Sequence, residues 1–313
     1  MNLDHLPRID ASALASLMPV TAAIDVVEQL LRAGFDPETD PPRQVLGVDV
    51  GDVLIMPAHT AQWVGVKVAT VAPGNPARDL PRIQALYILI DAMTLTPVAL
   101  FDGTALTSLR TPAVSAVAVR HLAAPDAAHL VVFGTGPQAW SHVDAFCAVR
   151  PISRVTLVPR SPGRAELLAE HCRSSLGLHT RIGAPDSVAE ADIVACCTTA
   201  RTPLFSGDLL PDHAVVVAIG SHEPDAREVD DTTVRRSSVV VEARSAALRE
   251  AGDVVGAVRS GALDADRLIG LAELVNGTVD KPPGPRLYKS VGMSWQDLAV
   301  AAAGYERSLQ REL

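Results

Sequence analysis

Two glycines separated by one residue, Gly134 and Gly136, follow the apolar run LVVF and precede a segment that can form a helix. A strand that passes into a helix through glycines lets the backbone come close to a pyrophosphate. The free N–H groups and the positive dipole end of the helix bind the anion without a charged side chain. The third position of the usual pattern is Ala139 instead of glycine. We predict a dinucleotide site here, and its other residues are Thr135, Pro137 and Gln138.

The end of the next predicted strand bears on the choice of dinucleotide. NAD sites normally place Asp or Glu there, about twenty residues after the glycines, to bind the ribose 2′-hydroxyl. This chain instead has Arg160, Ser161 and Arg164, and the first acid of the stretch is Glu166. Guanidinium groups and a hydroxyl suit a 2′-phosphate, so we predict NADP(H) as the preferred cofactor, with NAD(H) also possible. The alternative is that both arginines are surface residues at the start of a helix.

Cationic side chains in the first third of the chain could act on an anionic substrate. Lys67 lies within WVGVKVATV, where it points to solvent if one face of the strand is exposed. If it points into a cleft instead, desolvation lowers its pKa and suits it to proton transfer or carboxylate binding. Arg43 follows the Pro41-Pro42 break and, taken alone, is best explained as a solvated loop residue.

Arg110 has two possible settings, which depend on where its helix begins. An apolar stripe predicts a helix from about residue 105 to 122, with Asp102 or Thr104 as its cap. Because Pro112 is tolerated near a helix start, the helix could instead begin at about Thr111. Arg110 would then be a loop residue beside a helix N-terminus, a good position for holding a carboxylate. Otherwise it is an exposed helical arginine.

The elements around these residues fall into two groups. Apolar residues at helical spacing predict one helix over residues 12 to 33, and short strands from Val45 to Leu100 predict a largely antiparallel sheet. Beyond Pro125, strands and helices alternate, which is typical of a parallel doubly wound sheet with its ligand crevice at the carboxyl ends of the strands. Thr198 follows one such strand and is therefore a further cofactor candidate.

The predicted fold class is α/β, with a Rossmann doubly wound parallel sheet and a second α/β domain built from both chain ends. We expect the substrate domain at residues 1–123 with 289–313 and the NAD(P)-binding domain at residues 124–288. The final helix, SWQDLAVAAAGYERSL, should pack back on the amino-terminal part. The proline-rich run at residues 282–285 indicates a rigid connection between the domains.

Composition and charge exclude several classes of partner. The formal charge of −9 and the absence of a basic stripe argue against nucleic acid. No apolar run approaches the length of a membrane span, and the amino terminus has no secretory pattern, so we expect a cytoplasmic protein. The four cysteines show no metal spacing, and we expect no metal site.

Seven motifs along nearly the whole chain carry a resemblance to a known family. They are IMPA at 55–58, VKVATVAPGN at 66–75, FDGTALTSLRTPAVSAVA at 101–118, FGTGPQAWSH at 133–142, AIGSHEPDAREVDD at 218–231, EARSAALREAGDV at 242–254 and YKSVGMSWQDLA at 288–299. In their order and spacing they resemble the ornithine cyclodeaminase/mu-crystallin family. The chain is more similar to the mu-crystallin branch, which includes ketimine reductases, than to true cyclodeaminases.

The resemblance implies substrate roles for residues of the first domain. Lys67 matches the lysine at the substrate, and Arg110 matches the arginine that grips the substrate carboxylate, with Thr111 beside it. Arg43 matches a second carboxylate-binding arginine less closely, because the loop before it varies in length. The resemblance further implies a homodimer formed through the sheet of this domain.

The resemblance also implies cofactor roles. Gly134, Gly136 and Gln138 match the pyrophosphate turn, and Arg160 with Ser161 matches the element that holds the NADPH phosphate, although Pro159 replaces its Asn. The late segment that closes over the nicotinamide is matched by Ser290 and Gly292.

Two departures from the cyclodeaminases concern their catalytic acids. Gly220, Ser221 and His222 stand where cyclodeaminases carry a catalytic Asp after two glycines, and the later acid is Asp225. Leu54 precedes IMPA where we expect an acid in cyclodeaminases. Cyclodeamination needs both a base and an acid, so these losses argue against it. His222 could still act as an acid or base near neutral pH, although a histidine at a strand end is more often structural.

We therefore predict an NADPH-dependent reductase of α-imino acids, such as pyrroline- or piperideine-2-carboxylate, with hydride transfer to the imine carbon. Lys67 is the preferred proton donor to the imine nitrogen, and His222 is the second candidate. The alternatives in mechanism are an ornithine cyclodeaminase or an NAD-dependent amino-acid dehydrogenase. A non-catalytic NADPH-binding protein of the crystallin kind is the alternative from another class.

Overall fold

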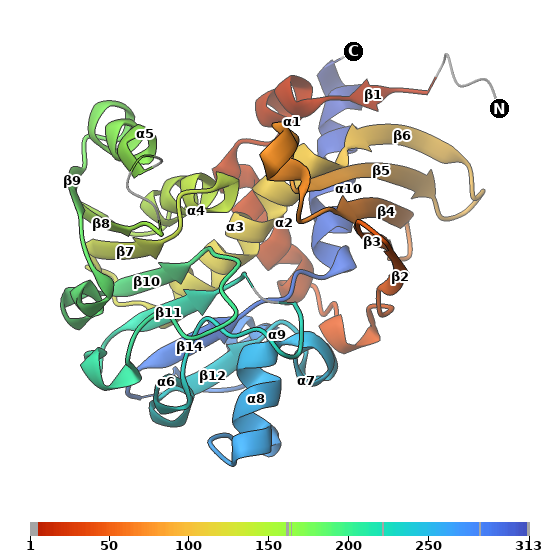
Figure 1. The fold of residues 1–313 in the computed structure, drawn as a ribbon. Coiled ribbons are helices and arrows are strands. Elements are labelled where there is room, and N and C mark those ends of the chain that lie inside the picture. Colours follow the sequence, from red (N-terminus) through yellow and green to blue (C-terminus); the bar gives the residue numbers. More distant parts are fainter. Residues whose placement is uncertain (1–5, 161–162, 164, 221, 282, 312–313) are drawn as a thin grey trace. The chain divides into compact units, whose positions relative to one another are not determined.

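The computed structural model describes residues 6–160, 163, 165–220, 222–281 and 283–311 of the 313-residue chain. These residues form two compact units, each assembled from separate stretches of sequence. Unit 1 comprises the described residues up to Leu30, Thr39–Thr111 and the residues from Met293 onward. Unit 2 comprises Leu31–Glu38 and Pro112–Gly292. Figure 1 shows the elements of both.

Unit 1 is built on a six-stranded sheet with the strand order β1-β6-β5-β4-β3-β2. All neighbouring strands are antiparallel except β1 and β6, so the predicted largely antiparallel sheet is confirmed. Its strands are β1 (Arg8–Ile9), β2 (Gln44–Val48), β3 (Gly51–His59), β4 (Trp63–Val71), β5 (Ile83–Asp91) and β6 (Pro97–Asp102).

One face of this sheet is covered by α10 (Ser294–Arg311), which packs against β3, β4 and β5. The alternation of side chains along β4 shows which face this is. Gly65, Lys67 and Ala69 are buried, whereas the intervening Val68 is exposed. The strand therefore turns Lys67 toward the covered face and Val64, Val66 and Val68 toward the open one.

The single helix predicted over residues 12 to 33 is wrong, because the structure has two helices there. They are α1 (Ala11–Leu17) and α2 (Val20–Arg32), and they are bent by 70° relative to one another. Pro19 lies between them, and a proline disfavours helical geometry at the preceding residue. Met18 accordingly has φ −129° and ψ 75°, outside the helical region.

Helix α3 (Gly103–Leu122) begins eight residues before the later of the two predicted starts. Asp102 is its cap, since Oδ1 accepts hydrogen bonds from the N–H groups of Thr104 and Ala105, both at 2.9 Å. The prediction of Arg110 as a loop residue is therefore wrong. Pro112 lies inside the helix, where it removes one backbone hydrogen bond. The helix tolerates this loss because its second half is buried on nearly all sides.

Unit 2 contains an eight-stranded, entirely parallel sheet with the order β13-β12-β14-β11-β10-β7-β8-β9. The first strand of this series, β7, lies in the middle between β8 and β10, so the strand order reverses at its carboxyl end. The predicted doubly wound α/β class is confirmed. The strands are β7 (His129–Phe133), β8 (Arg154–Val158), β9 (His179–Ile182), β10 (Ile193–Cys196), β11 (Val215–Ala218), β12 (Ser238–Val241), β13 (Ile269–Gly270) and β14 (Arg286–Lys289).

Strands β7, β10 and β11 are buried along their whole length, as in a parallel sheet covered on both faces. Strand β14 was not predicted; it returns late in the chain and inserts between β11 and β12. The helices of the unit, besides the second half of α3, are α4 (Pro137–Cys147), α5 (Ala165–Glu170), α6 (Asp231–Arg236), α7 (Arg244–Glu250), α8 (Gly252–Ser260) and α9 (Leu271–Val275).

No single helix among the described residues is both long and apolar enough to cross a membrane. Only α1 and α2 taken together, with the bend between them, meet the requirements of length and composition.

Candidate active site

Three charged side chains meet in the interior of unit 1. The Lys67 ammonium lies 2.6 Å from Oδ2 of Asp297, and the Nε of Arg110 donates to Oδ1 of the same carboxylate at 3.2 Å. Exposure of these side chains is 2% for Lys67, 5% for Arg110 and 0% for Asp297. Strand β4, helix α3 and helix α10 each supply one member. The structure thus brings together the two cations that the sequence singled out and adds a carboxylate.

Further hydrogen bonds fix both cations. Arg110 Nη1 donates to Oε1 of Gln296 at 2.7 Å, and Lys67 Nζ donates to Oγ1 of Thr107 at 3.4 Å. The Thr107 hydroxyl itself donates to the backbone carbonyl of Gly103, so it acts as an acceptor for Lys67. Thr111, on the helix next to Arg110, is also buried.

Burial is the largest cause of a lowered pKa at Lys67. Desolvation and then the Arg110 guanidinium lower the pKa of Lys67 from 10.5 to about 7, although Asp297 acts in the opposite direction. Arg43, half-buried just before β2, also lowers the pKa of Lys67. An amine with a pKa near neutrality exchanges protons readily at physiological pH, which suits a general acid or base.

The cluster retains hydrogen-bond donors that the protein does not use. An ammonium has three donors and a guanidinium five. Within the described part of the chain, Nζ of Lys67 has two partners and Nη2 of Arg110 has none. Two buried cations share one carboxylate, which leaves one positive charge to be neutralised. A small monocarboxylate satisfies both the charge and the donors.

Asp297 and Gln296 were missed by the sequence reasoning, which used this segment only for a helical face. A signal was present in WQDLA, where two polar residues stand inside an otherwise apolar helix. Both side chains are fully buried. Long polar side chains are rarely buried without a partner, so such a pair marks a polar contact inside a core.

Gly134 in unit 2 is required by the backbone itself. Its φ of 99° lies in the region that favours glycine, and a Cβ there would lie 2.4 Å from the carbonyl oxygen of Cys197. This contact joins the end of β7 to the residue that follows β10. The strand order reverses between these two strands, which is the place where doubly wound sheets bind ligands.

At position 136, by contrast, the backbone does not require a glycine. Gly136 is the N-cap of α4 with an ordinary φ of −81°, and a Cβ there would meet nothing within 4 Å. The open space in front of the helix N-terminus fits the close approach of a phosphate group. Pro137 occupies the first turn of α4, where its missing N–H is tolerated, and Thr135 is half-buried in the turn.

The backbone of Gln138 is fixed by a buried histidine of the same unit. The Gln138 carbonyl accepts from Nδ1 of His142 at 2.7 Å, and Nε2 of this histidine lies 3.0 Å from the Ser115 hydroxyl. Burial lowers the pKa of His142 to about 4, so the ring is neutral. Oε1 of Gln138 is buried and has no hydrogen-bond partner among the described residues. An unpaired acceptor beside the glycine turn fits a ligand that supplies a donor.

Thr198 is tied to a carboxylate that the sequence reasoning missed. Its N–H and its hydroxyl donate to Oε1 of Glu228 at 2.9 and 2.7 Å, and the N–H of Gly220 donates to Oε2 at 2.7 Å. Glu228 therefore joins the loops that follow β10 and β11. Its burial raises its pKa to about 7.

The remaining cofactor candidates lie at other strand ends. Arg160 is exposed just beyond β8, whereas Ser161 and Arg164 lie outside the described residues. Ser290 and Gly292 follow β14, and both donate hydrogen bonds to the Glu242 carboxylate. The Ser290 hydroxyl lies 2.8 Å from Oε1, and the Gly292 N–H lies 3.1 Å from Oε2. Gly292 has a φ of 73°, so this turn needs glycine.

The two acid-base candidates outside unit 1 have different settings. His222 follows β11 in unit 2 and is half-buried. Asp225 is 80% exposed and lies 3.5 Å from Arg259, so it is a surface ion pair. No group of three or more His, Cys, Asp or Glu side chains in the described ranges could hold a metal ion.

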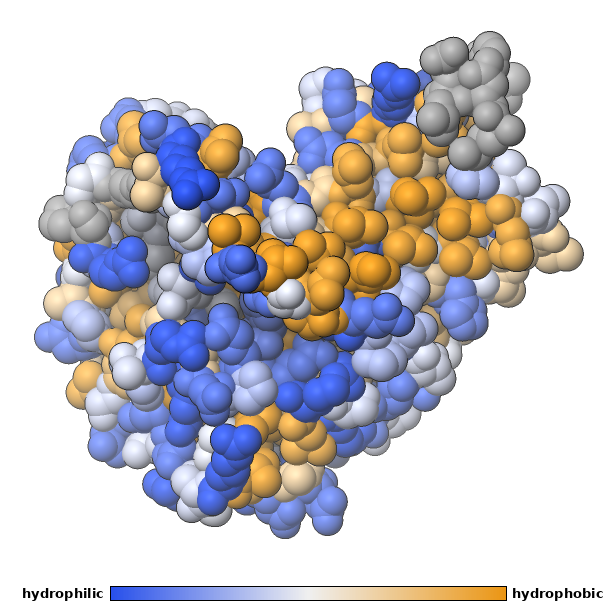
Figure 2. All heavy atoms as spheres, turned by 45° about the vertical axis from the view of Figure 1, so that its right-hand side comes forward, coloured by the Kyte–Doolittle hydropathy of each residue, from blue (hydrophilic) through white to orange (hydrophobic). Residues whose placement is uncertain are grey.

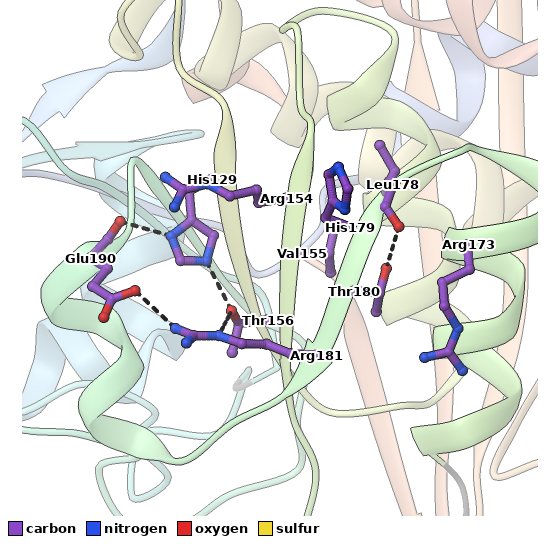
Figure 3. Close-up of a pocket in the computed structure, with 10 residues that line it drawn as sticks. All are labelled: His129, Arg154, Val155, Thr156, Arg173, Leu178, His179, Thr180, Arg181 and Glu190. Atoms are coloured by element: carbon purple, nitrogen blue, oxygen red, sulfur yellow. Dashed lines mark hydrogen bonds and ion pairs between the residues drawn. The ribbon is translucent and has the colours of Figure 1, made fainter.

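A cavity of about 430 Å³ lies at the opposite, amino-terminal ends of β7, β8 and β9 (Figure 3). Its polar groups largely satisfy one another. Arg181 donates to Thr156 and Glu190, and the ring of His129 lies within 2.9 Å of the Thr156 hydroxyl and the Glu190 carbonyl. Ligands of doubly wound sheets bind at the carboxyl ends, so this cavity is separate from the predicted dinucleotide site.

Comparison with known proteins identifies the family of this chain. The profile of the ornithine cyclodeaminase/mu-crystallin family matches residues 10–312. The chain belongs to this family. A Δ1-pyrroline-2-carboxylate reductase of Bacillus cereus is 34% identical over 267 residues, which cover 82% of each chain.

Solved structures that are similar to this chain share its whole fold. The Δ1-pyrroline-2-carboxylate reductase of Thermococcus litoralis, in complex with NADH and L-proline, has a TM-score of 0.94 and 30% identity over 98% of this chain and 99% of its own. An archaeal alanine dehydrogenase dimer with bound NAD has a TM-score of 0.92 and 26% identity, and the match covers 98% of this chain and 97% of the dehydrogenase chain. The family resemblance predicted from the motifs is therefore confirmed.

Proposed function

We propose that the chain is a nicotinamide-dependent reductase that converts an α-imino acid into the α-amino acid. The observation that carries this proposal is the buried pair Lys67 and Arg110, which share one carboxylate and keep one positive charge and unused donors for a substrate carboxylate. The similarity to pyrroline-2-carboxylate reductases supports an imine of the pyrroline- or piperideine-2-carboxylate kind.

In the proposed reaction, unit 1 binds the substrate and manages the proton. Arg110 presents Nη2 to the carboxylate, because Asp297 and Gln296 occupy its other two nitrogens. Lys67, with a pKa near 7, donates a proton to the imine nitrogen. A dihydronicotinamide, when bound, would supply the hydride for the imine carbon. The proton and the hydride together give the amine. Lys67 then takes a proton from solvent, and His222 is the second candidate for the proton transfer.

We assign the dinucleotide to unit 2 and keep residues 124–288 as the proposed NAD(P)-binding domain, with residues 1–123 and 289–313 as the substrate domain. The open space at Gly136, the unpaired oxygen of Gln138 and the N-terminus of α4 support this assignment. We further propose a preference for NADP(H), because Arg160 is exposed beyond β8, where a 2′-phosphate would need a cation. The two solved relatives hold NADH and NAD, so NAD(H) is the alternative.

We also propose a homodimer formed through the open face of the unit 1 sheet. Ile55, Val68 and Leu86 lie in one row across β3, β4 and β5, and their exposed fractions are 39%, 38% and 63%. Figure 2 shows hydrophobic residues gathered into a broad apolar area. Apolar patches of this kind commonly mark interfaces. The similar alanine dehydrogenase is a dimer.

The reducing cytoplasm is the proposed site of action. Four cysteines lie within the described residues, at 147, 172, 196 and 197, and all are free thiols. Free, mostly buried thiols are typical of a reducing compartment.

The test of the proposed function follows NADPH and NADH oxidation with pyrroline-2-carboxylate, piperideine-2-carboxylate, and pyruvate plus amines. We expect oxidation with at least one cyclic imine and formation of the matching amino acid. Release of ammonia from ornithine without net cofactor consumption would instead identify a cyclodeaminase. Cofactor binding without turnover of any imine would identify a binding protein.

A further inference from the structure

Asp297 divides its two oxygens between two cations from different elements. Oδ2 lies 2.6 Å from Nζ of Lys67 on β4, and Oδ1 accepts from Nε of Arg110 on α3. The carboxylate itself is carried by α10 and is fully buried. One side chain thus connects three elements and fixes both cations of the site at once.

Asp297 is the acid that acts most strongly on the charge of Lys67. Among the largest influences on the pKa of Lys67, the Arg110 and Arg43 guanidiniums lower it and Asp297 raises it. Without the carboxylate, two buried cations would face each other unscreened, which is costly in a medium of low dielectric constant. Tyr87, the cross-strand neighbour of Lys67, is a neutral phenol here, because burial, Asp297 and Asp40 raise its pKa well above 10.

The contact with Arg110 contributes to which guanidinium nitrogen is available to a substrate. Asp297 takes Nε and Gln296 takes Nη1, so Nη2 is the nitrogen left for the substrate. A guanidinium is a rigid planar fork, and fixing two of its nitrogens fixes the direction of the third.

We propose that Asp297 is a positioning residue of the imine reductase, which holds Arg110 for the substrate carboxylate and keeps Lys67 protonated for transfer to the imine nitrogen. This inference rests on the proposed function. In the step concerned, the N–H bond of Lys67 breaks and a new N–H bond forms on the substrate nitrogen, while the imine carbon takes up the hydride that a dihydronicotinamide would supply. Asp297 neither gains nor loses a proton; it stabilises the ammonium before the transfer and attracts a proton from water to Lys67 afterwards.

The test compares the pH profiles of kcat/KM for wild type, Asp297→Asn and Asp297→Glu with a cyclic imine. We expect kcat/KM to fall at high pH as Lys67 loses its proton. In Asp297→Asn this fall should move to lower pH by about one pH unit or more, because the neighbouring negative charge is lost. Asp297→Glu should restore most of the profile. Protonation of the free imine is common to all the proteins, so differences between them report on the enzyme.

Gln296→Leu is the matched control, since Gln296 binds Arg110 but has no hydrogen bond to Lys67. It should raise KM for the imine without moving the pH profile. A purely structural role of Asp297 would lower the amount of folded protein and leave the profile of the folded fraction unchanged. A wild-type profile in Asp297→Asn would therefore overturn the inference.

A second measurement needs no activity. The free energy of unfolding of wild type and Asp297→Asn is followed from pH 5.5 to 9 by denaturant titration. Loss of the carboxylate should lower the pKa of Lys67 further, so the variant should lose additional stability as the pH falls below about 7. If Asp297→Asn is too unstable for this titration, Lys67→Met/Asp297→Asn removes one of the two cations left without the carboxylate and should be more stable than Asp297→Asn. A double variant that is no more stable than Asp297→Asn, or parallel stability curves, would count against the pairing.

These measurements separate two failures. If wild type reduces no imine but the stability curves diverge as expected, the proposed function is wrong and the pairing of Asp297 with Lys67 holds. If wild type is active and neither the pH profile nor the stability curve moves, the role of Asp297 is wrong and the reductase assignment stands.

Discussion

Lys67 and Asp297 form an ion pair of 2.6 Å in which both side chains are almost completely buried. A buried pair of this kind contributes little net stability, because desolvation of both charges offsets their attraction. Arg110 adds a second cation to the same carboxylate. The arrangement therefore has a surplus positive charge inside a core, which is better explained by a bound anion than by folding alone.

Substitution of Lys67 by Met should abolish most of the turnover. The variant loses the proton donor, and general acid catalysis is worth about 10²–10⁴-fold in rate. Cofactor affinity should stay close to wild type, since the proposed dinucleotide site lies in unit 2. Steady-state kinetics and a fluorescence titration of NADPH measure the two effects. Thr70→Ala, on the same strand β4, is the control and should keep its activity. Retention of most of the rate by Lys67→Met would remove this residue from the mechanism.

The burial of Lys67 should appear as a pH dependence of stability. Its pKa is about 7 in the folded protein and 10.5 in the unfolded chain, so the unfolded state binds more protons between these values. Stability due to this group is therefore full above pH 10.5 and is lost as the pH falls toward 7. The slope is at most about 1.4 kcal/mol per pH unit. The free energy of unfolding of wild type and of Lys67→Met is measured by denaturant titration from pH 7 to 10. The difference between the two proteins should rise with pH, and a difference that does not change with pH would contradict the lowered pKa.

Replacement of Arg110 by Lys should weaken substrate binding more than it slows the chemical step. A lysine keeps the charge but loses the planar fork, and it cannot bind Asp297, Gln296 and a carboxylate in the same geometry. We expect KM for the imine to rise about 10–100-fold, the equivalent of 1.4–2.8 kcal/mol. Initial-rate measurements over a range of imine concentrations separate KM from kcat. An unchanged KM would exclude Arg110 as the carboxylate ligand.

Arg160→Ala should shift the cofactor preference toward NADH. The exposed guanidinium beyond β8 is the proposed partner of the 2′-phosphate, which only NADPH carries. The ratio of kcat/KM for NADPH to that for NADH should fall about tenfold or more. Arg154→Ala is the matched control, because this exposed arginine begins the same strand at its opposite end. A ratio that responds equally to both changes, or to neither, would contradict the assignment.

Leu86→Lys should produce a monomer. This side chain is 63% exposed in the row that also contains Ile55 and Val68, and a lysine buried in an apolar interface is costly. Sedimentation or light scattering gives the mass. Leu167→Lys, at a comparably exposed leucine of unit 2, should leave the oligomeric state unchanged. A wild type that is already monomeric would refute the proposed interface.

Local patterns in the sequence were sufficient for much of the framework. The antiparallel strands of unit 1, the parallel sheet of unit 2 and the glycine turn at Gly134 depend on alternation, apolar runs and turn residues that lie close together in the chain. The same local reasoning failed where a distant packing preference decided the outcome. It placed one helix across Pro19, and it allowed a late helix start at Thr111 because it could not weigh the burial that stabilises α3 around Pro112.

The sequence by itself determined that Lys67 and Arg110 are cations inside apolar segments, and that a strand, a glycine turn and a helix follow one another at Gly134. Only the tertiary structure decided what these residues face. A period of two gives a strand two faces but does not say which one a helix will cover, and α10 covers the face of Lys67. Asp297 is separated from Lys67 by 230 positions and from Arg110 by 187. Contacts over such distances arise from packing of the whole unit, because no local interaction brings the three side chains together.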